Sequence, residues 1–319
     1  MRRRTFLIGV PLLAARRAVA APAPITALTY TPDGASVVCS GYREILVCSL
    51  RDGAVARRIP CDLAQIHDLA FSPDGAVLAA AGGTPGTSGA AQMLTWPEGK
   101  PLAVLARSQD LATSAGFSPD GSMLAVAGSD RTVQIWDAGK GPSTAPSLTL
   151  TGHAGPVLAV RYSPDGKLLV TTSADRSLRV WDARTGELQR ALTNHTGIVH
   201  GVAFAPPIQG GSPHPYCASG SDDRTVRIWQ PGIGRMVRIV RGHSGPVLSV
   251  LYNRDGTRLF AAGTEGIVRV IDAESDQVLK SWKASDQWIY RLALSPDGTV
   301  LAAGDWAGKL RFWRWASSG

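Results

Sequence analysis

One turn sequence recurs along the chain at nearly regular intervals. Ser-Pro-Asp-Gly occurs at 72–75, 118–121, 163–166 and 295–298, and weaker copies stand at 31–34 and 253–256. With Ala205-Pro206 in the remaining place, the seven starts are 41 to 48 residues apart. A period of roughly 40–45 residues suits one four-stranded unit of a radial repeat architecture. The spacing therefore indicates seven similar units rather than two unrelated domains.

Within a unit, the residues between the turns have the pattern of short strands. In one unit the expected strands are Val157–Tyr162, Leu168–Ser173, Leu178–Asp182 and Leu188–Leu192. Proline presets φ at the second turn position and glycine accepts a positive φ at the fourth. The 35 glycines, 21 prolines and 18% charged residues also favour short strands and tight turns. No stretch shows a sustained 3.6-residue period, so we predict an all-β chain with almost no helix.

Residue pairs at fixed places in the units resemble those of the WD-repeat family of β-propellers. Gly152-His153 and Gly242-His243 open units, and Trp136-Asp137 and Trp181-Asp182 close third strands. The resemblance covers about residues 25–315 and implies a seven-bladed β-propeller of four-stranded antiparallel blades. It also implies a monomeric, non-catalytic scaffold that binds a protein or peptide partner, whose identity the sequence does not reveal.

The family also uses a hydrogen-bond chain of His, Ser or Thr, Asp and Trp within a blade, which satisfies buried polar groups. The resemblance assigns two such chains, formed by His153, Ser173, Asp175 and Trp181, and by His195, Ser221, Asp223 and Trp229. Other blades depart from this pattern. Cys48 and Ile271 stand in the Trp position, and Ser108 stands in the His position. We expect apolar packing to hold those blades together.

The first 20 residues differ in character from the repeats. A basic start is followed by an apolar stretch at 6–15 and by Ala18-Val19-Ala20, which is the layout of an export signal. Residues 3–7, Arg-Arg-Thr-Phe-Leu, resemble the twin-arginine motif. We expect export to the periplasm or the extracellular space, with residues 21–319 forming the propeller.

An alternative uses the same residues differently. The chain ends after three strands of the seventh unit, expected at 289–295, 300–304 and 309–315, and residues near 13–21 could supply the fourth. The leader would then be retained, and the protein would be a cytoplasmic regulatory scaffold. No apolar run reaches the roughly 18 residues of a membrane span.

The charge of the chain does not indicate nucleic-acid binding. The net charge is +8, but five arginines lie in the first 20 residues, which contain no acid. Without those five, 28 basic residues face 25 acidic ones, a net charge of +3. A scattered excess of this size lacks the basic patch that nucleic-acid binding requires.

Motifs of catalysis and metal binding are scarce in this sequence. The chain lacks a glycine-rich phosphate loop, a Gly-x-Ser-x-Gly elbow and any Cys-x-x-Cys pair. His67 and His200 occupy the same first-strand position in blades two and five, on opposite sides of the ring, too far apart to share one ion. We therefore predict no enzyme activity, no metal and no cofactor. A periplasmic enzyme or small-ligand binder that uses the central channel remains the alternative.

Three aromatic residues depart from the repeat on one face of the ring, the top face, where the first strand of each blade begins. Trp288 stands where other blades have proline, Tyr290 where they have leucine, and Trp306 where they have alanine or aspartate. Aromatic residues are enriched at binding hot spots, so these three are candidates for partner binding. Alternatively, they cover the imperfect seventh blade. Further candidates on the same rim are His67, His200, Gln65 and Asp222.

Overall fold

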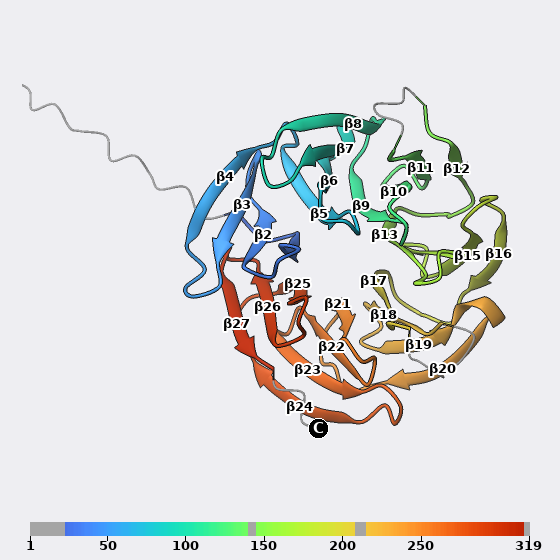
Figure 1. Cartoon of the computed structure of the whole chain (residues 1–319). Helices are drawn as coiled ribbons and strands as arrows, with labels where there is room; N and C mark the ends of the chain where they lie inside the picture. The colour runs from blue at the N-terminus through green and yellow to red at the C-terminus, as the bar shows by residue number, and fades with distance from the viewer. Residues whose placement is uncertain (1–22, 140–144, 208–214, 316–319) are drawn as a thin grey trace, which may run out of the picture.

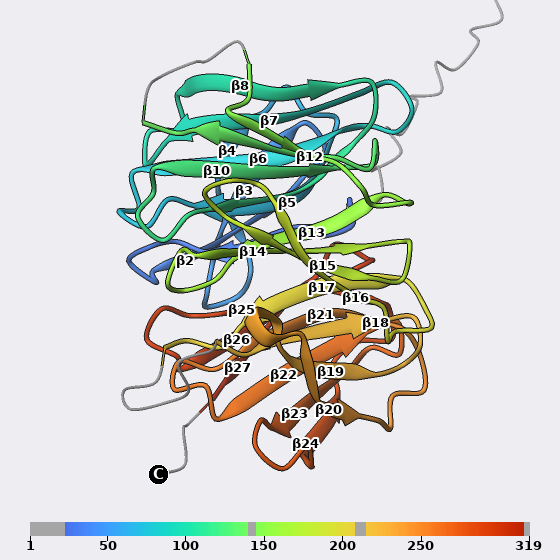
Figure 2. The ribbon, with the colours of Figure 1, turned by 90° about the vertical axis from the view of Figure 1, so that its right-hand side faces the viewer.

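The computed structural model describes residues 23–139, 145–207 and 215–315. They form seven antiparallel sheets arranged radially around a common axis (Figure 1). Six sheets have four strands in chain order, and the seventh has three. Seen from the side, the strands run from one face of the ring to the other (Figure 2). The predicted seven-bladed propeller is confirmed.

Each blade contributes one strand to each of four concentric layers. The innermost strands are β1 (Leu28–Tyr30), β5 (Gln65–Phe71), β9 (Ala112–Phe117), β13 (Val157–Tyr162), β17 (Val199–Phe204), β21 (Val247–Tyr252) and β25 (Ile289–Leu294). The second strands are β2 (Ser36–Ser40), β6 (Val77–Thr84), β10 (Met123–Gly128), β14 (Leu168–Ser173), β18 (Cys217–Ser221), β22 (Arg258–Gly263) and β26 (Val300–Asp305). The third strands are β3 (Glu44–Ser49), β7 (Ser88–Thr95), β11 (Val133–Asp137), β15 (Leu178–Asp182), β19 (Val226–Gln230), β23 (Ile267–Asp272) and β27 (Leu310–Arg314). The outer strands are β4 (Val55–Pro60), β8 (Pro101–Ser108), β12 (Leu148–Leu150), β16 (Leu188–Leu192), β20 (Arg235–Val240) and β24 (Val278–Lys283).

Helix is almost absent from the described part of the chain, as the lack of a 3.6-residue period predicts. The one helical segment there is the 3-10 turn η1 (Pro231–Ile233). Within the same residues, no helix is long and apolar enough to cross a membrane.

The recurring turn is built by its own side chains. In the copy at 163–166, the Ser163 hydroxyl donates to the Asp165 carboxylate at 2.6 Å and accepts from the backbone N–H of Leu168 at 2.9 Å. The Asp165 carboxylate also accepts from the N–H of Lys167. Gly166 closes the turn with φ of +70°, a conformation that side chains disfavour. The repeated aspartates therefore hold turns, which explains why they recur at this period.

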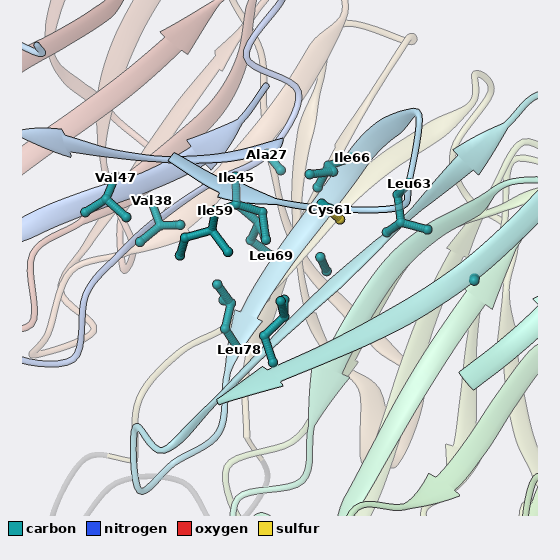
Figure 3. Packing of buried hydrophobic residues seen from close by; sticks show 13 residues of the cluster. Ala27, Val38, Ile45, Val47, Ile59, Cys61, Leu63, Ile66, Leu69 and Leu78 are labelled. Carbon is teal, nitrogen blue, oxygen red and sulfur yellow. The ribbon is translucent and has the colours of Figure 1, made fainter. Parts of the chain in front are cut away.

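The core lies between the blades rather than inside them. Seven clusters of buried apolar side chains occupy the seven blade-to-blade interfaces. Figure 3 shows the cluster between blades one and two, where Val38 and Ile45 of one sheet face Leu69 and Leu78 of the next. Each sheet thus buries both faces against neighbours, which explains the nearly continuous apolar runs of the second strands.

The ring closes between the first and last blades in the same way. Leu28 and Val37 pack with Ala293 and Ala302 in one cluster. The Tyr30 hydroxyl donates to the carbonyl of Val300 at 3.1 Å, and the N–H of Ile25 donates to the carbonyl of Asp305 at 3.1 Å. These contacts join the two ends of the repeat array through side chains and backbone.

Aromatic side chains contribute to the interface between blades six and seven. Trp313 of β27 packs against Trp282 of β24, with ring centroids 5.6 Å apart, and Trp315 packs edge-on against Phe260 at 5.1 Å. The expected fourth strand at 13–21 and the expected export signal at 1–20 both lie outside the described residues.

Candidate interaction surface

A cavity of about 610 Å³ opens on the top face of the ring. Its wall includes one residue from, or just before, the innermost strand of each blade: Thr26, His67, Thr113, Leu158, His200, Leu248 and Tyr290. The walls are mainly apolar and aromatic, and the volume lies within the roughly 300–1,000 Å³ of ordinary ligand pockets.

A repeated β-bulge selects these wall residues. In β13, Val157 pairs with Ser173 and Ala159 pairs with Thr172, so Leu158 is left between them without a partner. The same register shift leaves out His67, Thr113, His200, Leu248 and Tyr290. A bulge turns the extra side chain away from the regular alternation. Each bulged strand therefore delivers one side chain to the cavity without disturbing the core.

Trp288, Tyr290 and Trp306 form one aromatic cluster at the mouth of this cavity. Their ring centroids are 5.5 to 6.3 Å apart, and the rings are tilted against one another. The backbone N–H of Trp306 donates to the carbonyl of Trp288 at 2.9 Å, which fixes the two loops together. Trp288 is 49% exposed and Trp306 is 50% exposed, while Tyr290 is partly buried beneath them. The three residues that depart from the repeat thus lie together in space.

The other rim candidates line the same cavity. His200 Nε2 lies 2.6 Å from an Asp222 carboxylate oxygen, and this pair forms part of the wall contributed by blade five. Burial and the nearby charge of Arg291 lower the pKa of His67, so its ring is neutral at pH 7. Gln65 is exposed at the start of β5 and also lines the cavity. The structure therefore gathers all seven sequence candidates around one opening.

The sequence analysis missed a charged network below the cavity. Arg291 lines both the top cavity and a second cavity beneath it, while Asp68 and Arg161 line only the lower one. One Asp68 carboxylate oxygen accepts from Ser114 Oγ at 2.6 Å and from Arg161 Nη1 at 3.1 Å. Burial would raise the pKa of Asp68, but the charges of Arg161 and Arg291 outweigh it and lower that pKa. Asp68 is thus an anion between two cations.

A signal for this network was present in the repeat. Arg291 and Asp68 each follow a bulged residue, and blades four and five have Ala159 and Gly201 in that place. A comparison of this position across blades, like that made for the rim, would have singled out both charges.

The two predicted hydrogen-bond chains are present with a different hydroxyl in each. His153 Nδ1 lies 2.8 Å from the Asp175 carboxylate, and His153 Nε2 lies 2.7 Å from Thr171 Oγ1. Trp181 Nε1 donates to the same Thr171 oxygen at 2.9 Å. Ser173 takes no part, since it donates to the carbonyl of Gly155 and accepts from the N–H of Asp175.

Blade five repeats the correction. Ser219 bridges His195 and Trp229, at 2.8 Å from each, whereas Ser221 accepts from the N–H of Asp223. The assignments of Ser173 and Ser221 were therefore wrong. Because Trp229 is paired with Cys217 across the sheet, its indole nitrogen reaches the residue two positions further along β18, but not four.

Burial and hydrogen bonding set the protonation states of His153 and Asp175 in the hydrogen-bond chain of blade four. Burial lowers the pKa of His153 despite its bond to Asp175. Burial would raise the pKa of Asp175, but hydrogen bonds from Ser177 and His153 bring it to about 2. A neutral His153 therefore donates from Nδ1 to the ionised Asp175, and its Nε2 accepts from the Thr171 hydroxyl.

Two comparisons identify the kind of protein. The family model described as IFT122 first beta-propeller matches residues 91–318. The chain belongs to this family of WD-repeat propellers. A segment of 74 residues is 38% identical to the guanine nucleotide-binding protein subunit beta of Schizosaccharomyces pombe, and the match covers 23% of each chain. WD-repeat propellers typically act as scaffolds that bind protein partners.

Other blades of this WD-repeat propeller lack parts of the hydrogen-bond chain, and the structure shows what replaces them. In blade six, Ala261 and Ile271 stand in the Thr and Trp places, and His243 Nε2 is buried without a partner. In blade three, Val126 leaves Trp136 Nε1 unpaired. In blade one, Cys39 and Cys48 take both places, with their sulfur atoms 3.9 Å apart in a thiol–thiol hydrogen bond and no disulfide between them.

Metal-binding side chains do not cluster in the described part of this WD-repeat propeller. No cluster of three or more His, Cys, Asp or Glu side chains there could hold an ion. The four cysteines are free and buried. Two hydroxyls that line the cavity, those of Thr26 and Thr113, donate to the backbone carbonyls of Ile66 and Val157.

Proposed function

We propose that this propeller is an exported, non-catalytic scaffold that binds a protein or peptide partner on its top face. The observation that carries the proposal is the cluster of Trp288, Tyr290 and Trp306. Two half-exposed indoles rest on a third aromatic ring at the mouth of a cavity. Aromatic side chains supply large contact areas at low entropic cost and dominate protein interfaces.

The alternative, that these rings only cover the imperfect seventh blade, is less well supported. The interface of that blade with blade six already contains other aromatic side chains, those of Trp282, Trp313 and Trp315. Trp288 and Trp306 lie on the top face instead and leave about half of their surface to solvent. A ring that served packing alone would be expected to bury more of itself.

The non-catalytic part of the proposal is supported by how the cavity uses its polar groups. The hydroxyls of Thr26 and Thr113 are engaged with backbone carbonyls, so neither is positioned beside a general base. The His200–Asp222 pair lies on the rim. Such groups orient and stabilise the wall, and they fit recognition better than bond cleavage.

The top-face proposal is tested with a phage-displayed library of random peptides selected on the full chain. Trp288→Ala combined with Trp306→Ala should abolish binding of most selected peptides and reduce the free energy of unfolding by no more than about 2 kcal/mol, because both indoles are already half exposed. Leu279→Ala is the matched control, because Leu279 is also 50% exposed but lies on the outer strand β24. Peptides that bind the double variant as well as the parent would contradict the proposal, as would a large loss of stability.

Export is tested separately by mass spectrometry of the mature amino terminus in the native host. Export predicts a chain that begins at Ala21. A chain that retains Met1 or begins at Arg2 would instead support the cytoplasmic scaffold whose leader closes blade seven.

A further inference from the structure

The top cavity carries an uneven set of charges. Arg291 contributes a cation to its floor. Asp222, the one carboxylate that the described residues give to the wall, is paired with His200 at 2.6 Å. The His67 ring beside Arg291 is neutral, because burial and the Arg291 charge both lower its pKa. The floor of the cavity is therefore positive.

The nearest acid below the floor does not cancel this charge. Asp68 is bound by Ser114 Oγ at 2.6 Å and by Arg161 Nη1 at 3.1 Å. Two arginines share this one carboxylate, so the group carries a net charge of +1. Asp68 also faces the lower cavity rather than the upper one.

Arg291 has N–H donors that its hydrogen bond within the protein does not use. A guanidinium offers five N–H donors, and the hydrogen bond found for Arg291 runs from Nη2 to the carbonyl of His67 at 3.1 Å. Its Nε is buried without a partner, and so is Nε2 of the adjacent His67. Among the described residues, these are the two side chains lining the top cavity that have buried unpaired polar atoms. An unpaired donor in a low-dielectric site is costly, and a carboxylate satisfies a guanidinium with two parallel hydrogen bonds.

We propose that the cavity selects a partner segment that carries an acidic side chain next to an apolar one, with the carboxylate bound by Arg291 and the apolar group held by the aromatic cluster. This inference rests on the proposed partner-binding role of the top face. Complementary charge specifies the occupant, since the floor is cationic and the mouth is aromatic. Tyr290 and Arg291 are consecutive residues, so one strand supplies both an apolar contact and an ionic contact.

A peptide segment fits this cavity better than a free small anion. The volume of about 610 Å³ far exceeds the needs of an inorganic ion. Leu158, Leu248 and Pro246 provide apolar wall above the floor, which a small hydrophilic ion would leave unused.

The test uses arrays of end-blocked decapeptides that differ only at one central position, Glu, Gln or Lys, beside a Leu, Phe or Trp. The labelled full-length chain is applied at 0.15 M salt. We expect Glu peptides to bind at least about fivefold more tightly than their Gln partners, and Lys peptides to bind least. Equal binding of the three sets, or binding of none, overturns the acid preference.

Substitutions assign the preference to its residue. Arg291→Gln should reduce binding of Glu peptides to the level of the Gln peptides and leave binding of the Gln peptides unchanged. Arg291→Lys keeps the charge without the paired donors, so it should retain part of the preference even if Arg291→Gln does not fold. Arg254→Gln, at an exposed turn of blade six, removes the same charge elsewhere and should change nothing. A Glu preference that survives both Arg291 variants overturns the inference.

The two proposals fail in different ways. The Trp288→Ala and Trp306→Ala double variant should lose all three peptide sets, because it removes the shared apolar contact. If the double variant no longer binds the peptides but the parent chain does not distinguish Glu from Gln peptides, the proposed partner-binding surface is supported and the proposed acid preference is wrong. If Glu peptides still bind the double variant and Arg291→Gln abolishes that binding, the proposed aromatic contact is wrong and the proposed role of Arg291 is supported.

Discussion

Blades four and seven solve the same packing problem with different chemistry. In blade four, His153, Thr171, Asp175 and Trp181 form a continuous buried hydrogen-bond chain. In blade seven, Ser285 stands in the place of the histidine and donates to Asp305 at 2.7 Å, and Ala307 stands in the place of Asp175. Aromatic rings, not a polar chain, dominate the top of that blade.

The two blades also differ in how their top loops are held and in what those loops present to solvent. Where the chain is complete, the top loops are tied to the blade through the Asp175 carboxylate, which also accepts from the N–H of Ala154. In blade seven, Asp305 instead accepts from the Ser285 hydroxyl and from the N–H groups of Ala307 and Lys309, and the neighbouring positions 288 and 306 hold indoles that are about half exposed. Blade four thus has a buried polar chain at its top, whereas blade seven has exposed aromatic rings there.

The largest expected difference lies between a buried and an exposed tryptophan. Trp229→Ala should reduce the free energy of unfolding by about 3–5 kcal/mol, because its side chain is fully buried and anchors Ser219. Trp306→Ala should reduce it by only about 1 kcal/mol, because that indole is half exposed. Urea denaturation at pH 7 measures both. Comparable losses would mean that Trp306 is a packing residue and would erase the distinction between the blades.

A smaller effect separates the two hydroxyls of blade four. Thr171→Val removes the hydroxyl without changing the shape, and leaves Trp181 Nε1 and His153 Nε2 buried without partners, at a cost of about 1–3 kcal/mol. Ser173→Ala removes only turn bonds and should cost about 0.5–1.5 kcal/mol. The same denaturation experiment ranks them. A larger loss for Ser173→Ala would restore the original assignment.

The last expected difference is a selective response to acid. Burial lowers the pKa of His153 and His195 in the folded protein, so the unfolded chain takes up these protons first as the pH falls below about 6.5. Each histidine can then remove up to about 1.4 kcal/mol per pH unit from the free energy of unfolding. Hydrogen exchange at pH 7 and pH 5, corrected for intrinsic rates, should show protection of β15 and β19 falling more than that of β26. Uniform loss around the ring would contradict this.

The regular parts of the molecule could be predicted from the sequence because the turns fix the register. The four strands of blade four have their predicted bounds, and those of blade seven differ by at most one residue at either end. Proline, aspartate and glycine act locally in each turn, so their effect does not depend on the rest of the chain.

The errors arose where the outcome depends on reach across a sheet. Thr171 and Ser173 lie on the same face of one strand, and only the position of the Trp181 indole decides which hydroxyl it meets. Arg291, Arg161 and Asp68 come from three blades that are far apart in the sequence, and only the closed ring brings them together. A comparison of repeat positions can single out such residues, but it does not show which of them meet in space.

The bulge at the start of the inner strands has a consequence for how this surface can diversify. Because the bulged residue lies outside the hydrogen-bond ladder, exchanging it alters neither strand pairing nor the interblade core. In six of the seven blades, the backbone therefore fixes the place of one cavity-lining side chain while leaving its identity open to change. Two propellers could share every strand and still have no ligand in common. The mouth of the cavity could be redesigned by changing one bulged residue at a time.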